Sequence, residues 1–143
     1  MSILMVMDLH GATTDDYDKL NEVMGVDPAH MPDGLLSHAV GPFDDGLLIV
    51  DTWESQEALD KFFEERIGPG MQEAGVDARP EPRIFPVHND IPQGAGTDPG
   101  VIIVIESPGF HADAYDDLTG GMDAHAGDGS NHPAVSHLSL IHI

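Results

Sequence analysis

The sequence predicts an α+β fold whose elements follow the order strand, helix, strand, strand, helix, strand within residues 1–90. Three observations predict it. Short apolar runs of strand length recur, two segments between them carry apolar residues at helical spacing, and glycine or proline clusters separate the segments. This order is that of a ferredoxin-like βαββαβ antiparallel sheet with both helices on one face.

The first strand and helix are expected within the first 25 residues. Residues 2–9 form an apolar run of strand length, which Gly11 closes. Thr13 or Thr14 is expected to cap a helix, because a side-chain oxygen there satisfies free backbone N–H groups, and Gly25 is expected to end it. The apolar stripe of this helix consists of Tyr17, Leu20 and Met24.

The next two strands are expected to form a hairpin. Residues 35–40 form one strand, residues 46–53 form the other, and the glycine- and proline-rich residues 41–46 read as the connection. Alternation along the second of these strands places Asp51 on the same face as Ile49 and Trp53. A carboxyl group among apolar residues is the least conventional feature of this strand.

The second helix is expected to begin after Ser55, which is a good N-cap residue. Residues 68–70 (Gly-Pro-Gly) are expected to interrupt it, and Pro69 could start a further turn. A proline-rich connection then leads to a last strand at residues 83–89. The first and last strands need not pair, so no shared site of His10 and His88 is expected. The apolar face of the helix consists of Ala58, Leu59, Phe62, Phe63 and Ile67.

After a linker at residues 91–100, the pattern begins again. A shift of 98 positions lays residues 5–20 over residues 103–118, with six identities in sixteen columns that include Tyr17 with Tyr115. With one inserted residue, the pair at 37–38 meets the same pair at 136–137. We therefore expect residues 101–143 to be an incomplete second unit (strand, helix, strand) of a tandem, C-terminally truncated chain; chance similarity of two amphipathic helices is the alternative.

The last six residues, 138–143 (LSLIHI), have two interpretations. They match the in-frame translation of a transposon end that sequencing-library adapters use, which would make them adapter-derived. Their composition also suits an ordinary β-strand.

The net charge of −21 comes from 26 acidic and 5 basic residues, and 18 of the acids are Asp. Such a polyanion repels nucleic-acid phosphate and anionic membranes, so neither is an expected partner. An Asp-rich, Lys-poor surface is typical of halophilic proteins; ordinary acidity is the alternative. The absence of cysteine and of a signal-like start fits a cytoplasmic protein.

Residues 50–62 (VDTWESQEALDKF) resemble the dimeric α/β-barrel superfamily, and their pattern is most similar to antibiotic-biosynthesis-monooxygenase-like domains. In that family a strand ends in an aromatic residue, often Trp, and an acidic-Ser step leads into a helix. The resemblance implies that two such sheets pair into a barrel, either between two chains or within one duplicated chain. Self-association through the sheet face, or an intramolecular pseudo-dimer, is therefore expected.

The resemblance also implies a range of activities: cofactor-free oxygenation of phenols and quinols, haem degradation and isomerisation. Active members commonly carry a His within the second helix, where this chain has Phe62 and Phe63. We therefore expect either a cofactor-independent monooxygenase- or isomerase-like enzyme for a small hydrophobic or aromatic compound, or a non-catalytic ligand-binding or stress-associated module on the same fold.

Two residues are the catalytic candidates and three the ligand-binding candidates. His38 suits a general base if a partner fixes its tautomer, and Asp51 suits a base or polarising group if it is buried. Each also has a structural interpretation, as a hydrogen-bonded His and as an exposed strand-end Asp. Trp53 is expected to form an aromatic wall or to pack the strand against the second helix. The other ligand-binding candidates are His10 and Phe62.

No cofactor and no metal site is expected. The loose group of His and Asp residues between Asp123 and His137 has no established metal-ligand spacing. Residues 94–96 (Gly-Ala-Gly) follow no suitable strand and open no helix, so they do not predict a phosphate-binding loop.

Overall fold

The computed structural model describes residues 1–90, 100–123 and 139–141. The chain divides into two compact units, Met1–Pro86 and Val87–Ile143. None of the helices in the described parts is long and apolar enough to cross a membrane.

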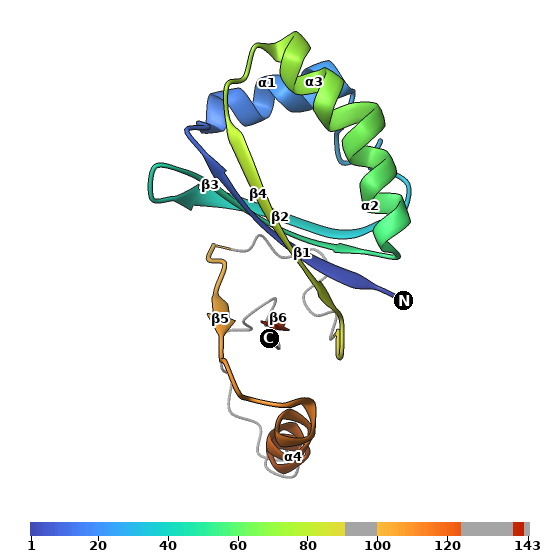
Figure 1. The fold of residues 1–143 in the computed structure, drawn as a ribbon, viewed down its shortest axis with the longest axis vertical. Helices are drawn as coiled ribbons and strands as arrows, with labels where there is room; N and C mark the ends of the chain where they lie inside the picture. Colours follow the sequence, from blue (N-terminus) through green and yellow to red (C-terminus); the bar gives the residue numbers. More distant parts are fainter. Residues whose placement is uncertain (91–99, 124–138, 142–143) are drawn as a thin grey trace. The chain divides into compact units, whose positions relative to one another are not determined.

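The first unit has the predicted α+β ferredoxin-like fold. Its four strands form an antiparallel sheet of order β2-β3-β1-β4, and its helices cover one face of that sheet (Figure 1). The strands are β1 (Ile3–His10), β2 (Leu35–Phe43), β3 (Gly46–Trp53) and β4 (Arg79–Pro86). The helical segments are α1 (Thr14–Met24), α2 (Gln56–Phe62), the π-helical turn η1 (Phe63–Ile67) and α3 (Gly68–Ala74).

Both expected N-caps are present, and they fix where the helices begin. Thr13 caps α1 through a capping box in which its hydroxyl accepts from the Asp16 backbone N–H while the Asp16 carboxylate accepts from the Thr13 N–H. Ser55 caps α2 by accepting from the Ala58 N–H. Gly25 ends α1 in the left-handed conformation, with a φ of 67°.

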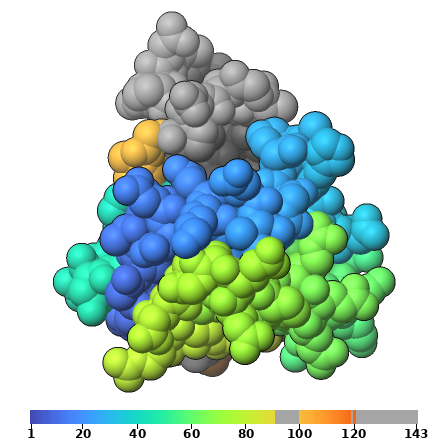
Figure 2. Space-filling view, turned by 90° about the horizontal axis from the view of Figure 1, so that it is seen from above, coloured from blue at the N-terminus to red at the C-terminus, as the bar shows by residue number. Residues whose placement is uncertain are grey.

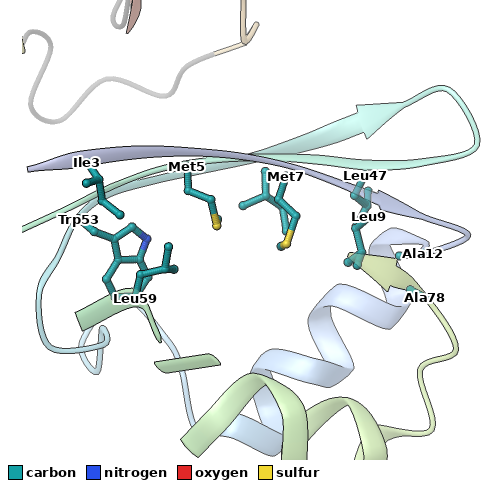
Figure 3. Packing of buried hydrophobic residues seen from close by; sticks show 10 residues of the cluster. Ile3, Met5, Met7, Leu9, Ala12, Leu47, Trp53, Leu59 and Ala78 are labelled. Atoms are coloured by element: carbon teal, nitrogen blue, oxygen red, sulfur yellow. The ribbon is translucent and has the colours of Figure 1, made fainter. Parts of the chain in front are cut away.

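The core lies between the helices and the face of the sheet that they cover. Ile3, Met5, Met7 and Leu9 extend from β1 toward the helices (Figure 3). Because β1 is a central strand, all four side chains are buried. They pack with Leu47, Ile49, Trp53, Leu59 and other buried residues of the same cluster.

The second helix differs from the expectation, because residues 68–70 do not interrupt it. The helix continues from α2 through η1 into α3, and in η1 the Gly68 N–H bonds back to the Phe63 carbonyl, five residues earlier. As expected, Pro69 lies in the first turn of a further helical segment, α3; because this segment follows the π-helical turn directly, Pro69 donates no backbone hydrogen bond to the preceding turn. Gly70 is buried, and it lets α3 approach α1 closely; the outer surfaces of the two helices lie side by side in Figure 2.

The last strand was also predicted incorrectly. It covers Arg79–Pro86 rather than residues 83–89, and it includes Pro80 and Pro82. Both prolines are tolerated because β4 is an edge strand that bonds to β1 on one side only. The sequence left the pairing of the first and last strands open; they pair directly, in antiparallel register.

The second unit contains β5 (Val104–Glu106), α4 (Ala112–Asp123) and β6 (Ser139–Ile141), and β5 pairs with β6 in parallel. When the bounds of α1 are shifted by 98 positions, they nearly coincide with those of α4. Gly11 and Gly109, which the same shift aligns, have φ values of 81° and 80°. The tandem copy, its truncation and the adapter origin of residues 138–143 remain predictions. Several segments to which these predictions apply lie outside the described residues. They are residues 91–99 of the expected linker, the repeated pair at 136–137, and residues 138, 142 and 143.

Candidate functional site

A cavity of about 620 Å³ lies between the sheet and the helices of the first unit. Its wall is largely apolar and includes Met5, Met7, Leu20, Met24, Ile49, Leu59, Phe62 and Phe63. Among the described residues that line it there is no Lys or Arg, and the acidic residues are Asp27 and Asp51. The wall therefore favours a neutral, hydrophobic ligand over an anion.

His38 and Asp51 meet in this wall as a directly opposed cross-strand pair. The β2–β3 register places His38 opposite Asp51, and the His38 Nδ1 lies 2.6 Å from an Asp51 carboxylate oxygen. The Asp51 side chain is only 7% exposed and that of His38 is 24% exposed. Since a carboxylate can only accept, the His38 Nδ1 donates to Asp51, and in the neutral imidazole the Nε2 is then an acceptor.

Tyr17 completes a chain of three polar groups that sequence reasoning missed. The Tyr17 hydroxyl lies 2.6 Å from the His38 Nε2, and the planes of the two rings are nearly parallel, 6° apart. With Nε2 unprotonated, the phenol donates to it. The chain therefore runs from Tyr17 on α1 through His38 on β2 to Asp51 on β3, and all three residues line the cavity.

Burial raises the pKa of Tyr17, because the phenolate would lose its hydration. A hydrogen bond with Asn21, one turn further along α1, opposes this shift, whereas the negative charges of Asp51 and Asp18 add to it. The net effect keeps the Tyr17 phenol protonated at neutral pH. Tyr17 is thus a hydrogen-bond donor in the resting site.

Trp53 and Phe62 form an aromatic part of the wall. Trp53 is 1% exposed, and its ring centroid lies 5.4 Å from that of Phe62. The indole N–H is buried and has no hydrogen-bond partner within the part of the chain that the structure describes. Figure 3 shows the ring below β1, with its nitrogen on the side that faces Met5. A buried donor without a partner costs about 1–3 kcal/mol, which an acceptor atom of a ligand would recover.

The structure does not bring His10 to this site. It lies at the far end of β1, outside the set of lining residues, where its Nδ1 is 2.9 Å from Asp45 and its Nε2 is 3.8 Å from Glu81. The hydrogen bond with Asp45 raises the pKa of His10, chiefly because it favours the imidazolium. His10 is therefore part of a surface ion pair.

The described residues contain no group of three or more His, Asp or Glu side chains arranged to hold a metal ion. Of the sequence group that was considered for a metal, the residues from His125 to His137 lie outside the described residues. The helix position at which the resembled family commonly has a His is occupied here by Phe62 and Phe63, which both line the cavity.

No family model matches the chain, and no curated protein sequence matches it. Solved structures similar to it include a mutant of SnoaB, a cofactor-independent oxygenase from Streptomyces nogalater, with 10% identity and a TM-score of 0.45 over 64% of this chain and 98% of that chain. Rv0793 from Mycobacterium tuberculosis has 14% identity and a TM-score of 0.45 over 63% of this chain and 98% of its own. A Chloroflexus aurantiacus protein, named provisionally as an antibiotic biosynthesis monooxygenase, has 18% identity and a TM-score of 0.42 over 61% of this chain and 95% of its own. At such low identities and TM-scores, these similarities assign no role to the side chains of this chain.

Proposed function

We propose that the chain is a cofactor-independent enzyme that removes a proton from a small, uncharged, hydrophobic or aromatic compound, as the first step of a monooxygenase-type reaction with dioxygen. The observation that carries this proposal is the His38–Asp51 pair in the wall of a largely apolar cavity. The cavity volume lies within the range of about 300–1,000 Å³ that is usual for small-molecule sites.

In this proposal His38 accepts the proton and Asp51 assists it. Asp51 holds the His38 ring in the tautomer with an unprotonated Nε2, and its charge stabilises the imidazolium that forms when the proton arrives. Low exposure of the carboxylate strengthens this effect, because little water competes for the charge. The pair thus supplies a base without a metal or an organic cofactor.

Trp53 and Phe62 would bind the substrate. Their rings offer a flat apolar surface, and the partnerless Trp53 N–H suits a carbonyl or hydroxyl oxygen of the bound compound. The carbanion or phenolate left by proton removal would form a carbon–oxygen bond with dioxygen. Cleavage of the O–O bond with loss of water would then leave a ketone, so dioxygen is the only oxidant required.

Oxygen uptake with a panel of anthrones and hydroquinones tests the proposal. We expect turnover by the wild type and a loss of about 100-fold or more in His38→Ala, with a smaller loss in Asp51→Asn, because positioned general bases contribute about 10²–10⁴-fold. Activity that survives both substitutions would contradict the assigned roles.

A non-catalytic ligand-binding module is the second candidate, and the mostly apolar wall favours it. Trp53 is the only Trp in the chain and lines the cavity, so its fluorescence reports binding directly. Saturable quenching by the same compounds, without oxygen uptake and without loss of their acidic protons, would support the binding module over the enzyme.

A further inference from the structure

Both ring nitrogens of His38 are already engaged. Nδ1 lies 2.6 Å from Asp51, and Nε2 lies 2.6 Å from the Tyr17 hydroxyl, whose ring plane is nearly parallel to that of the imidazole. A substrate in the cavity therefore cannot reach the basic lone pair of His38 unless Tyr17 moves away. The Tyr17 oxygen, by contrast, donates its single proton to His38 and keeps lone-pair capacity for another donor.

We propose that the Tyr17 hydroxyl is the group that meets the substrate, and that it transfers the substrate's proton to His38 rather than merely covering it. This inference rests on the proposed function, since it concerns the same site. It makes Tyr17 a catalytic residue and places His38 and Asp51 behind it as the acceptor and its stabiliser.

The proton balance of this step closes without a further reactant. The substrate O–H or C–H bond breaks as its proton bonds to the Tyr17 oxygen, and the original Tyr17 O–H bond breaks as that proton bonds to the His38 Nε2. The products are a substrate anion, a neutral Tyr17 and a His38 imidazolium beside the Asp51 carboxylate. The reverse sequence returns the proton to the product.

Tyr17 needs this relay, because it is not a base by itself. Burial raises the pKa of the phenol, so it remains protonated, and it can take up a second proton only while it gives up its own. Asn21, whose hydrogen bond with Tyr17 lowers that pKa, helps to hold the phenol in place.

The same geometry narrows the substrate class. The reacting group must present an acidic hydroxyl, or a C–H beside a carbonyl, to the Tyr17 oxygen from within an apolar cavity. A carboxylic acid does not fit, because its anion would face the Asp51 carboxylate without a Lys or Arg among the described lining residues. Neutral phenols and ketones with an activated methylene group do fit.

Anthrone is a suitable probe, because its methylene protons lie opposite a ketone. Exchange of these protons for deuterium, followed by NMR under nitrogen, measures proton removal without any oxygen chemistry. We expect the wild type to accelerate exchange and Tyr17→Phe to lower the enzymatic rate by about 100-fold or more. Binding of anthrone, measured by Trp53 fluorescence, is expected to change by less than about threefold.

Tyr115→Phe is the matched control. Tyr17 and Tyr115 are the only tyrosines in the chain, and Tyr115 does not line the cavity, so its exchange rate is expected to equal that of the wild type. The Tyr115→Phe background also allows 3-fluorotyrosine to be placed at Tyr17 alone. This analogue nearly keeps the shape of the side chain but changes the acidity of the phenol. A proton-transfer role predicts a changed exchange rate at unchanged anthrone affinity, even if Tyr17→Phe folds poorly.

The results that would contradict only the role of Tyr17 differ from those that would also contradict the proposed function. Exchange in Tyr17→Phe as fast as in the wild type, or an unaltered rate with fluorotyrosine, would show that the phenol only covers His38; this overturns the inference and leaves the proposed function intact. Absence of exchange with anthrone, together with absence of oxygen uptake with the panel of anthrones and hydroquinones, in the wild type would refute the proposed function and this inference together.

Discussion

Gly70→Ala tests how closely α1 and α3 pack beside the cavity. A Cβ atom at Gly70 would lie 2.7 Å from the Met24 Cγ and 3.2 Å from the Leu20 Cδ1, and both of these residues line the cavity. Gly68 is the matched control two residues earlier in α3, because a Cβ atom there would meet only the Phe63 carbonyl oxygen, at 3.4 Å. Neither glycine has a positive φ, so the backbone accepts alanine at both positions.

The two substitutions share one energy term and differ in the other. Ala is favoured over Gly in a helix by about 0.8–1 kcal/mol, which applies to both. Forcing an extra methyl group into a packed interior costs about 1–3 kcal/mol, which applies only to Gly70→Ala. We therefore expect Gly68→Ala to stabilise the chain by up to about 1 kcal/mol and Gly70→Ala to be less stable than Gly68→Ala by about 1–3 kcal/mol.

Urea and thermal unfolding of the full chain measure this difference. For a unit of this size, 1 kcal/mol corresponds to about 4–8 °C in Tm, so the two variants should differ by at least about 4 °C. Gly70→Ala should also weaken ligand binding in the cavity, because Met24 has to move from its present position. Equal stabilisation by both substitutions would refute the close approach of the two helices.

Three further predictions concern charge and assembly. The hydrogen bond with Asp45 raises the pKa of His10, so the stabilising contribution of His10 is complete below pH 6.5 and is lost as the pH rises through the raised pKa. The Tm of the wild type should therefore fall over that pH window, and the Tm of His10→Gln should fall less. Equal dependence of Tm on pH in the two proteins would contradict this. If the charge of −21 reflects adaptation to salt, Tm should rise between low and molar NaCl, and higher stability in low salt would exclude that interpretation. Light scattering should give a mass above the 15.3 kDa of one chain if the sheet face associates, whereas a well-behaved monomer would argue against it.

Most of the fold could be predicted because its signals are local. Thr13 and Ser55 are cap residues at the positions where the helices begin, and the strands follow the apolar runs. The continuity of the second helix could not be predicted, because the π-helical turn depends on how residues 63–67 pack in three dimensions. The prolines of β4 were misleading for a related reason, since only the sheet order shows that this strand lies at an edge.

The His38–Asp51 pair was within reach of the sequence. The connection between β2 and β3 is a two-residue turn in which Asp44 has a φ of 50°, and pairing outward from it brings His38 opposite Asp51. A six-residue connection, as expected from residues 41–46, leaves this register undefined. A two-residue turn at Asp44-Asp45 before a strand was therefore the signal that would have joined the two candidates.

Tyr17 could not be found in the same way, because its contact depends on how α1 lies across the sheet. In the sequence it is one member of an apolar stripe, and nothing local distinguishes it from Leu20. Burying a polar group is unfavourable unless its hydrogen bonds are made, and the neighbours of Asp51 on its face of β3 are Ile49 and Trp53. The two 2.6 Å contacts of His38, with Asp51 and with Tyr17, make those bonds within the wall. This chain of polar groups therefore supports the proposed proton transfer, which Tyr17→Phe tests.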